Sequence, residues 1–132
     1  MPSFGIASKA NLSSCHPDLQ RLLNEAIKHV DFSVTCGHRG KADQDAAVIA
    51  GNSTVNWPNS KHNSLPSLAA DIAPYHNGIK WDDVEGFTLL SGIIKGIAIM
   101  MGIKIRLGSD WDGDLEVKEH TFKDRPHIEL VL

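Results

Sequence analysis

Residues 68–75, with the sequence LAADIAPY, place one carboxylate, Asp71, in the middle of an otherwise apolar run. A short apolar run closed by a proline is typical of a buried strand. An ionised carboxylate is costly to remove from water unless a positively charged partner lies beside it. The fold must therefore leave Asp71 at an exposed position or bring a cationic partner to it from elsewhere in the chain.

The rest of the chain divides into segments with helical or strand patterns. Helical spacing of apolar residues is found in three segments: residues 16–30, 41–51 and 81–102. Short strands are predicted in four: residues 31–36, 68–75, 103–108 and 126–132. Asp82, followed three residues later by Glu85, resembles a helix-capping arrangement. We predict one α+β domain over residues 1–132, with helices packed on one side of a small, largely antiparallel sheet.

Charge and apolar content narrow the class of protein. The formal charge is −3 without long runs of one sign, which argues against nucleic acid or an anionic membrane as the main partner. The most apolar window, residues 89–105, is interrupted by Lys95 and Lys104, so a core helix is predicted there rather than membrane insertion. No signal peptide is evident at the N-terminus. Cys15 and Cys36 could form a disulfide, but reduced thiols are favoured.

Two histidine–aspartate pairs are the residues best suited to chemistry. His62 and Asp71 lie in one segment, and Asp124 and His127 in another. Two imidazoles and one carboxylate form a suitable ligand set for Zn²⁺ and leave a position for water. The second carboxylate could then act as a general base. On spacing alone an alternative stands, in which both histidines are ordinary and Asp71 pairs with Arg39 or a lysine.

The local sequence around these residues resembles that of the peptidoglycan zinc peptidases. This family includes D-alanyl-D-alanine carboxypeptidases and dipeptidases and phage L-alanyl-D-glutamate endopeptidases. The segment SKHNSLPSLAADIAPY is similar to their Ser-x-His…Ala-x-Asp motif, and DFSVTCGHRG to their strand followed by Gly-x-Arg. The segment GSDWDGD looks like the loop before the last strand in phage members. The resemblance covers residues 17–132 and implies that His62, Asp71 and His127 bind one catalytic zinc ion, on the sheet.

The same resemblance implies roles for three other residues. Asp124 is implied as the catalytic base, and Arg39 as the clamp that holds the substrate or the transition state. Ser60 is implied as a substrate contact, although a serine at this place can equally cap a turn. The chain departs from the commoner family pattern by a longer loop between the first histidine and the aspartate, and by Cys36 at a place that is often polar.

The short chain and the ending SDWDGD…FKDRPH look most like phage lysis enzymes of the L-alanyl-D-glutamate type. This implies hydrolysis of that bond in the peptidoglycan stem peptide for lysis of the host cell. Such an enzyme, expected as a monomer, is made in the host cytoplasm and reaches the wall through a separate membrane pore. Two alternatives are a D-alanyl-D-alanine carboxypeptidase or dipeptidase, and a non-catalytic wall-binding module on the same fold.

An acidic loop offers a second place for a cation. Its carboxylates are Asp110, Asp112, Asp114 and Glu116. Alternating oxygen ligands suit Ca²⁺, but the full pattern of an EF-hand loop is missing, so a solvated loop is favoured.

Four other side chains lie near the motifs in sequence. His38 and His120 are not expected to bind the metal. Trp81 and Trp111 could line a substrate groove or pack into the core.

Overall fold

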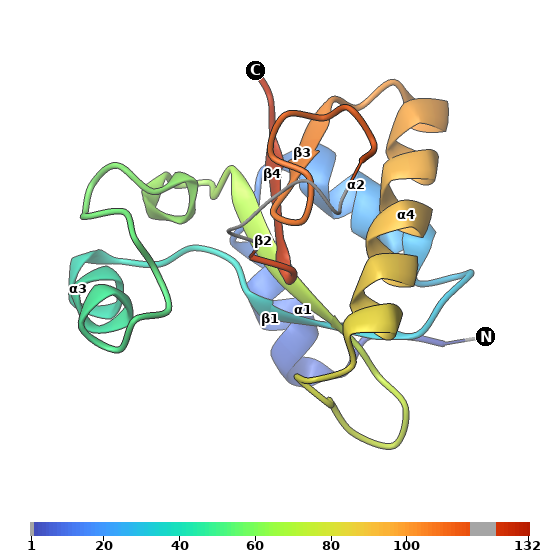
Figure 1. The fold of residues 1–132 in the computed structure, drawn as a ribbon, viewed down its shortest axis with the longest axis horizontal. Coiled ribbons are helices and arrows are strands. Elements are labelled where there is room, and N and C mark those ends of the chain that lie inside the picture. Colours follow the sequence, from blue (N-terminus) through green and yellow to red (C-terminus); the bar gives the residue numbers. More distant parts are fainter. Residues whose placement is uncertain (1, 117–123) are drawn as a thin grey trace.

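A four-stranded antiparallel sheet runs through the centre of the molecule (Figure 1). The computed structural model describes residues 2–116 and 124–132. The strands, in the spatial order β1-β2-β4-β3, are β1 (Phe32–Cys36), β2 (Ala69–Pro74), β4 (His127–Leu130) and β3 (Ile105–Leu107). All four coincide with segments predicted from their short apolar or alternating patterns, and the predicted antiparallel sheet is confirmed.

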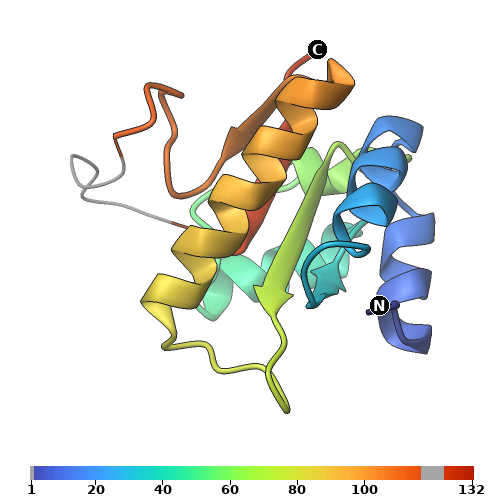
Figure 2. The same ribbon diagram turned by 90° about the vertical axis from the view of Figure 1, so that its right-hand side faces the viewer.

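Three helices pack on one side of this sheet, as predicted. They are α1 (Ile6–Ser13), α2 (Pro17–Ala26) and α4 (Val84–Met101). α1 contacts β1, α4 contacts β2 and β3, and α2 packs against α4. In the view of Figure 2, β2 is drawn between α4 to its left and α1 and α2 to its right. The remaining helix, α3 (Lys41–Ile49), lies apart from this group, and a 3₁₀ turn, η1 (Lys61–Asn63), precedes β2.

Alternation along the strands separates the core from the opposite face of the sheet. Ile72 on β2 and Ile128 and Leu130 on β4 belong to the hydrophobic core beneath the helices. Their neighbours Asp71 and His127 are paired across β2 and β4, and point to the other face because successive side chains in a strand alternate. Polar side chains of β2 and β4 therefore meet on the face of the sheet that is opposite to α1, α2 and α4.

α1 was not predicted from the sequence. Only Ser8 and Leu12 are buried in it, so its apolar pattern is weak. Its position is explained by the edge strand β1, whose outer backbone groups need partners. Ser8 Oγ accepts a hydrogen bond from the amide of Val34 (3.0 Å), and Asn11 Nδ2 donates one to the Val34 carbonyl (2.8 Å).

α4 begins one residue later than the capping pattern suggested. The N-cap is Asp83 rather than Asp82, and its carboxylate accepts a hydrogen bond from the amide of Gly86 (3.0 Å). By length and composition alone this helix could cross a bilayer. Within the described chain Leu90 and Ile94 of α4 lie in the core, which is the packing that the sequence predicted.

Candidate metal centre

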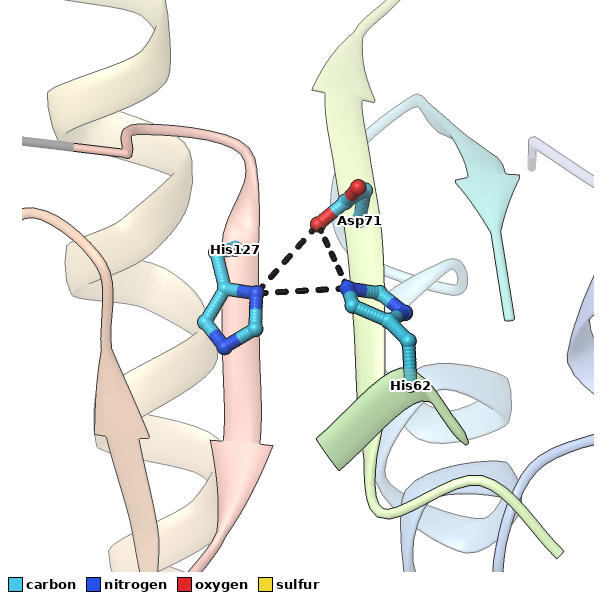
Figure 3. Close-up of side chains that lie close together, drawn as sticks. All are labelled: His62, Asp71 and His127. Carbon is cyan, nitrogen blue, oxygen red and sulfur yellow. Dashed lines mark hydrogen bonds and ion pairs between the residues drawn. The ribbon is translucent and has the colours of Figure 1, made fainter. Parts of the chain in front are cut away.

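Three side chains from three separate segments meet on the face of the sheet that is opposite to α1, α2 and α4 (Figure 3). His62 comes from η1, Asp71 from the middle of β2, and His127 from the first position of β4. His62 Nε2 lies 3.2 Å from Asp71 Oδ1 and 3.3 Å from His127 Nδ1. His127 Nδ1 lies 3.5 Å from the same Asp71 oxygen. The three atoms thus form a nearly equilateral triangle.

The two strand residues are brought together by register, and His62 by a capped turn. Asp71 and His127 are direct partners across β2 and β4. The amide of His62 donates to Ser60 Oγ (3.2 Å), and Asn63 Oδ1 accepts from the amide of Ser60 (3.0 Å), which completes a capping box. Ser60 therefore caps the turn that carries His62. Its role as a substrate contact stays a prediction, although it lines the adjacent cavity.

The long loop between His62 and Asp71 is held by the N-terminal part of the chain. The amide of Ser67 donates to the Ser14 carbonyl (2.8 Å), and the Ser67 carbonyl accepts from the amide of His16 (2.8 Å). These bonds fix the end of the longer loop just before β2 begins. The two ligand candidates can consequently face each other despite the departure from the commoner spacing.

Both histidine rings are oriented by acceptors on their outer sides. His62 Nδ1 lies 2.8 Å from the Gly37 carbonyl, which can only accept, so this nitrogen carries the proton. His127 Nε2 lies 2.8 Å from Glu129 Oε1 and donates in the same way. In the neutral rings, the inner nitrogens then carry the lone pairs, and these face Asp71. Gly37 must be glycine because a Cβ would overlap with the carbonyl oxygen of Asn11.

These atoms fit a tetrahedrally coordinated divalent cation. Two ring nitrogens and a carboxylate oxygen converge on one point, where Asp71 Oδ1 is buried 3.2 Å from His62 Nε2 and 3.5 Å from His127 Nδ1. Metal–ligand bonds of about 2.0–2.1 Å at tetrahedral angles separate neighbouring ligand atoms by about 3.3 Å. The three observed separations, 3.2, 3.3 and 3.5 Å, bracket that value.

Electrostatics at the site favour positive charge. Burial by itself lowers the pKa of His62, but the hydrogen bond and negative charge of Asp71, together with the contact to Cys36, outweigh it and raise the pKa to about 10. The pKa of His127 is also raised despite burial, by Asp71 and Glu129. Burial opposes ionisation of Asp71, yet both histidines hold its pKa well below the usual range. A bound cation would displace the protons that otherwise balance this charge.

Asp124 stands beside the three converging atoms without joining them. Its Oδ2 lies 4.0 Å from His127 Nδ1, and its side chain is 35% exposed. Burial and the nearby charge of Asp71 raise the pKa of Asp124. Its backbone amide donates to the Gly108 carbonyl (2.9 Å), and a Cβ on Gly108 would overlap with the Asp124 carbonyl. This close packing sets where the Asp124 carboxylate can reach.

Arg39 reaches the site from the loop after β1. Its Nη2 lies 3.6 Å from Asp71 Oδ2, on the side of the carboxylate away from the histidines. The contact between Asp71 and Arg39 that the sequence left as an alternative to a metal is therefore present together with the histidine cluster. Arg39 Nη1 donates to Oε1 of Gln44 (3.0 Å), a fully buried residue of α3.

A cavity of about 730 Å³ opens over these residues. Both tryptophans considered from the sequence, Trp81 and Trp111, line it. The ring centroids of Trp111 and His127 lie 5.5 Å apart, and Trp81 is 59% exposed. His38 Nδ1 lies 2.9 Å from the Ser64 carbonyl, and His38 is not part of the ligand cluster. His120 lies outside the described residues.

The acidic loop gathers Asp110, Asp112 and Asp114, whose oxygens lie within 4.8 Å of one another. Asp110 is buried and the other two are exposed. Asp110 Oδ2 accepts from the amide of Leu115 (2.8 Å), and Asp112 Oδ1 from that of Asp114 (3.3 Å). Glu116 is not part of this group. These contacts do not test the expectation of a solvated loop or the alternative of calcium binding.

Sequence reasoning missed two residues that support the site, Gln44 and Glu129. Glu129 had a signal, because it shares one face of the last strand with His127 two positions earlier. Gln44 had none, since a single glutamine in an amphipathic helix is ordinary. Its burial depends on contacts with Arg39 and Val55, which only the fold brings near.

Comparisons with known proteins show the family of the chain. The family model described as phage L-alanyl-D-glutamate peptidase matches residues 2–131. The L-alanyl-D-glutamate peptidase of Escherichia phage T5 is 35% identical over 135 residues, which cover 97% of each protein. The crystal structure of the L-Ala D-Glu endopeptidase ChiX of Serratia marcescens superposes with a TM-score of 0.77 at 29% identity, over 98% of this chain and 90% of that one. The chain therefore belongs to the phage L-alanyl-D-glutamate peptidase family.

Proposed function

We propose that this protein is a zinc-dependent endopeptidase that cleaves the L-alanyl-D-glutamate bond of the peptidoglycan stem peptide, with residues 1–132 as one catalytic domain. The observation that carries the proposal is the convergence of two imidazole nitrogens and one buried carboxylate oxygen within 3.2–3.5 Å. Family membership supports the choice of bond, because the phage T5 relative and ChiX are named for it.

The ligands and the chemistry follow from the donor set. His62, Asp71 and His127 would hold the ion, and nitrogen and carboxylate donors at tetrahedral spacing suit Zn²⁺. When bound, zinc supplies Lewis-acid polarisation of a peptide carbonyl and makes water acidic enough to attack near neutral pH. Gly37 and Glu129 keep the outer ring nitrogens occupied, so the inner ones remain available.

Proton transfer is assigned to Asp124. Its carboxylate lies at the edge of the ligand triangle and is partly open to the cavity. It would take the proton from the attacking water and deliver it to the leaving amine. A raised pKa makes the Asp124 carboxylate a stronger base than an ordinary aspartate, which favours removal of a proton from the attacking water.

Charge stabilisation and substrate holding are assigned to Arg39. Its guanidinium lines the cavity and is held by Gln44, so its remaining donors have a fixed direction. A planar fork of donors suits the developing oxyanion or a neighbouring carboxylate of the stem peptide. Ser60, on the same cavity wall, is proposed as a further substrate contact.

A digest of purified peptidoglycan tests the proposal. The products should carry new N-terminal D-glutamate, whereas released D-alanine would favour the carboxypeptidase or dipeptidase alternative. If wild-type protein left the wall intact with and without added zinc, a non-catalytic wall-binding module would be the better description. An Asp124→Ala variant, treated in parallel, controls for contaminating wall hydrolases.

Lysis of the host is the biological role that we propose for this activity. It is supported by membership of a phage peptidase family. The enzyme would be made as a monomer in the host cytoplasm, without binding nucleic acid or inserting into the membrane, and would need a separate pore to reach the wall. Bacteria that express it should lyse when their membrane is permeabilised and stay intact otherwise. Lysis without permeabilisation would contradict the need for a pore.

A further inference from the structure

Glu129 is a carboxylate placed almost entirely inside the protein, at 4% exposure. Both of its oxygens are engaged. Oε1 lies 2.8 Å from His127 Nε2, and Oε2 lies 2.9 Å from Arg106 Nη2 and 3.4 Å from Lys61 Nζ. A buried charge of this kind is tolerated only where its neighbours compensate it. Here two cations and one imidazole do so.

The sheet explains why these groups meet. Glu129 lies two residues after His127 on β4 and is therefore on the same face. Its direct partners are Arg106 on β3 and Ala69 on β2. Arg106 crosses from β3 to the carboxylate, whereas the short side chain of Ala69 leaves room for Lys61 to approach from η1.

Lys61 connects the turn that carries His62 to the carboxylate of Glu129. It immediately precedes His62 in η1, and its Nζ donates to the Leu130 carbonyl of β4 (2.9 Å) as well as approaching Glu129. The turn that carries His62 is thus tied by a side chain to the strand that carries His127. Among the described residues, η1 and β4 are also linked by the contact between His62 Nε2 and His127 Nδ1 (3.3 Å).

We propose that Glu129 is a positioning residue for the metal site. It fixes the ring of His127 with Nδ1 toward Asp71, and through Lys61 it holds the turn of His62 at the matching distance. Arg106 keeps the carboxylate charged and directed at the ring. This inference rests on the proposed function, because the position that Glu129 maintains is that of a zinc ligand.

Zinc affinity, measured by competition with a chromogenic chelator, tests the inference. Glu129→Ala should weaken zinc binding about 10–100-fold, the usual effect of removing a carboxylate behind a histidine ligand. Glu129→Gln should lose less, because its amide oxygen can still accept from Nε2. Glu25→Gln, a change on the exposed face of α2, is the matched control and should bind like wild type.

A spectroscopic signal separates positioning from general loss of structure. In zinc-loaded wild type, the Nε2 proton of His127 should appear in ring ¹H–¹⁵N spectra as a slowly exchanging signal. It should disappear in Glu129→Ala and persist in Glu129→Gln, while the Nδ1 proton of His62, held by Gly37, persists in both. Circular dichroism checks the fold. If Glu129→Ala does not fold, Glu129→Gln and Lys61→Met carry the affinity test.

The outcomes distinguish this inference from the function on which it rests. Wild-type protein that binds no zinc would overturn both. Wild-type protein that binds zinc and cleaves the wall, with folded Glu129 and Lys61 variants of unchanged zinc affinity, would overturn only the positioning role. Weaker zinc binding in Glu129→Ala, together with loss of the His127 ring signal, would support it.

Discussion

Two regions within residues 2–116 and 124–132 gather three potential metal ligands each, and they differ in what surrounds the ligand atoms. On the sheet face, His62, Asp71 and His127 are held by strand register and a capped turn, and their inner atoms face one another. In the acidic loop, the oxygens of Asp110 and Asp112 accept hydrogen bonds from the loop's own backbone. Clustering alone does not distinguish the two regions. The sheet-face cluster differs because its ligand atoms converge on one point and its histidine rings are oriented by hydrogen bonds at their outer nitrogens.

The largest effect is expected from removing a ligand on the sheet face. His62→Ala should abolish stoichiometric zinc binding and lower peptidase activity by on the order of a thousandfold or more, since several kcal/mol of metal-based stabilisation is lost. Chelation of wild type should have the same effect, reversed by added zinc. Metal analysis and the peptidoglycan digest measure both. Full activity in the folded, zinc-free variant would contradict the assignment of the sheet-face cluster, rather than the acidic loop, as the catalytic metal site.

A smaller loss, without loss of metal, is expected at Asp124. Asp124→Ala should retain one zinc per chain and the wild-type fold, while kcat falls about 10²–10⁴-fold, the range typical of a missing general acid–base group. Because Asp124 is not among the three converging atoms, zinc affinity should change little. Near-normal turnover would show that another group carries the proton.

Arg39→Lys should have a more moderate effect. The charge near Asp71 is kept, but the planar fork held by Gln44 is lost. We expect kcat/KM to fall about tenfold to a hundredfold at unchanged zinc content. Steady-state kinetics on soluble stem peptides, with Arg21→Lys on the exposed face of α2 as control, measures the difference. Equal values for the two variants would argue against a clamp.

The smallest effect is expected in the acidic loop. The double substitution of Asp112→Ala and Asp114→Ala removes two exposed carboxylates, and surface changes of this kind usually leave stability within about 0.5 kcal/mol. Zinc content should stay the same and activity should change less than about twofold. Millimolar Ca²⁺ should leave the melting temperature of wild type unaltered. A clear calcium-dependent rise, absent in the double variant, would instead establish the loop as a cation site.

Much of the fold was predictable because its strands and larger helices carry their periodicity locally. The last strand is an example. Its alternation predicted that His127 and Glu129 share one face and that Ile128 and Leu130 lie on the other, and the two apolar side chains are indeed in the core. The resemblance to the peptidase family, read from short motifs, is confirmed by the comparisons over nearly the whole chain.

The remainder depends on contacts between distant residues, which one sequence does not reveal. The carbonyl of Gly37 that orients His62 is 25 positions away in the chain. Gln44 is buried because Arg39, Asn63 and Val55 surround it. α1 is explained by the unpaired edge of β1 rather than by its own apolar pattern.

An anomalous-difference map at the zinc absorption edge, from crystals of zinc-loaded protein, tests the central claim most directly. The account predicts one strong peak bounded by His62 Nε2, Asp71 Oδ1 and His127 Nδ1, with Asp124 beside it but not bound. It predicts no comparable peak at the acidic loop. A map with no peak among these three side chains, or with the strongest peak between Asp110 and Asp114, would contradict it.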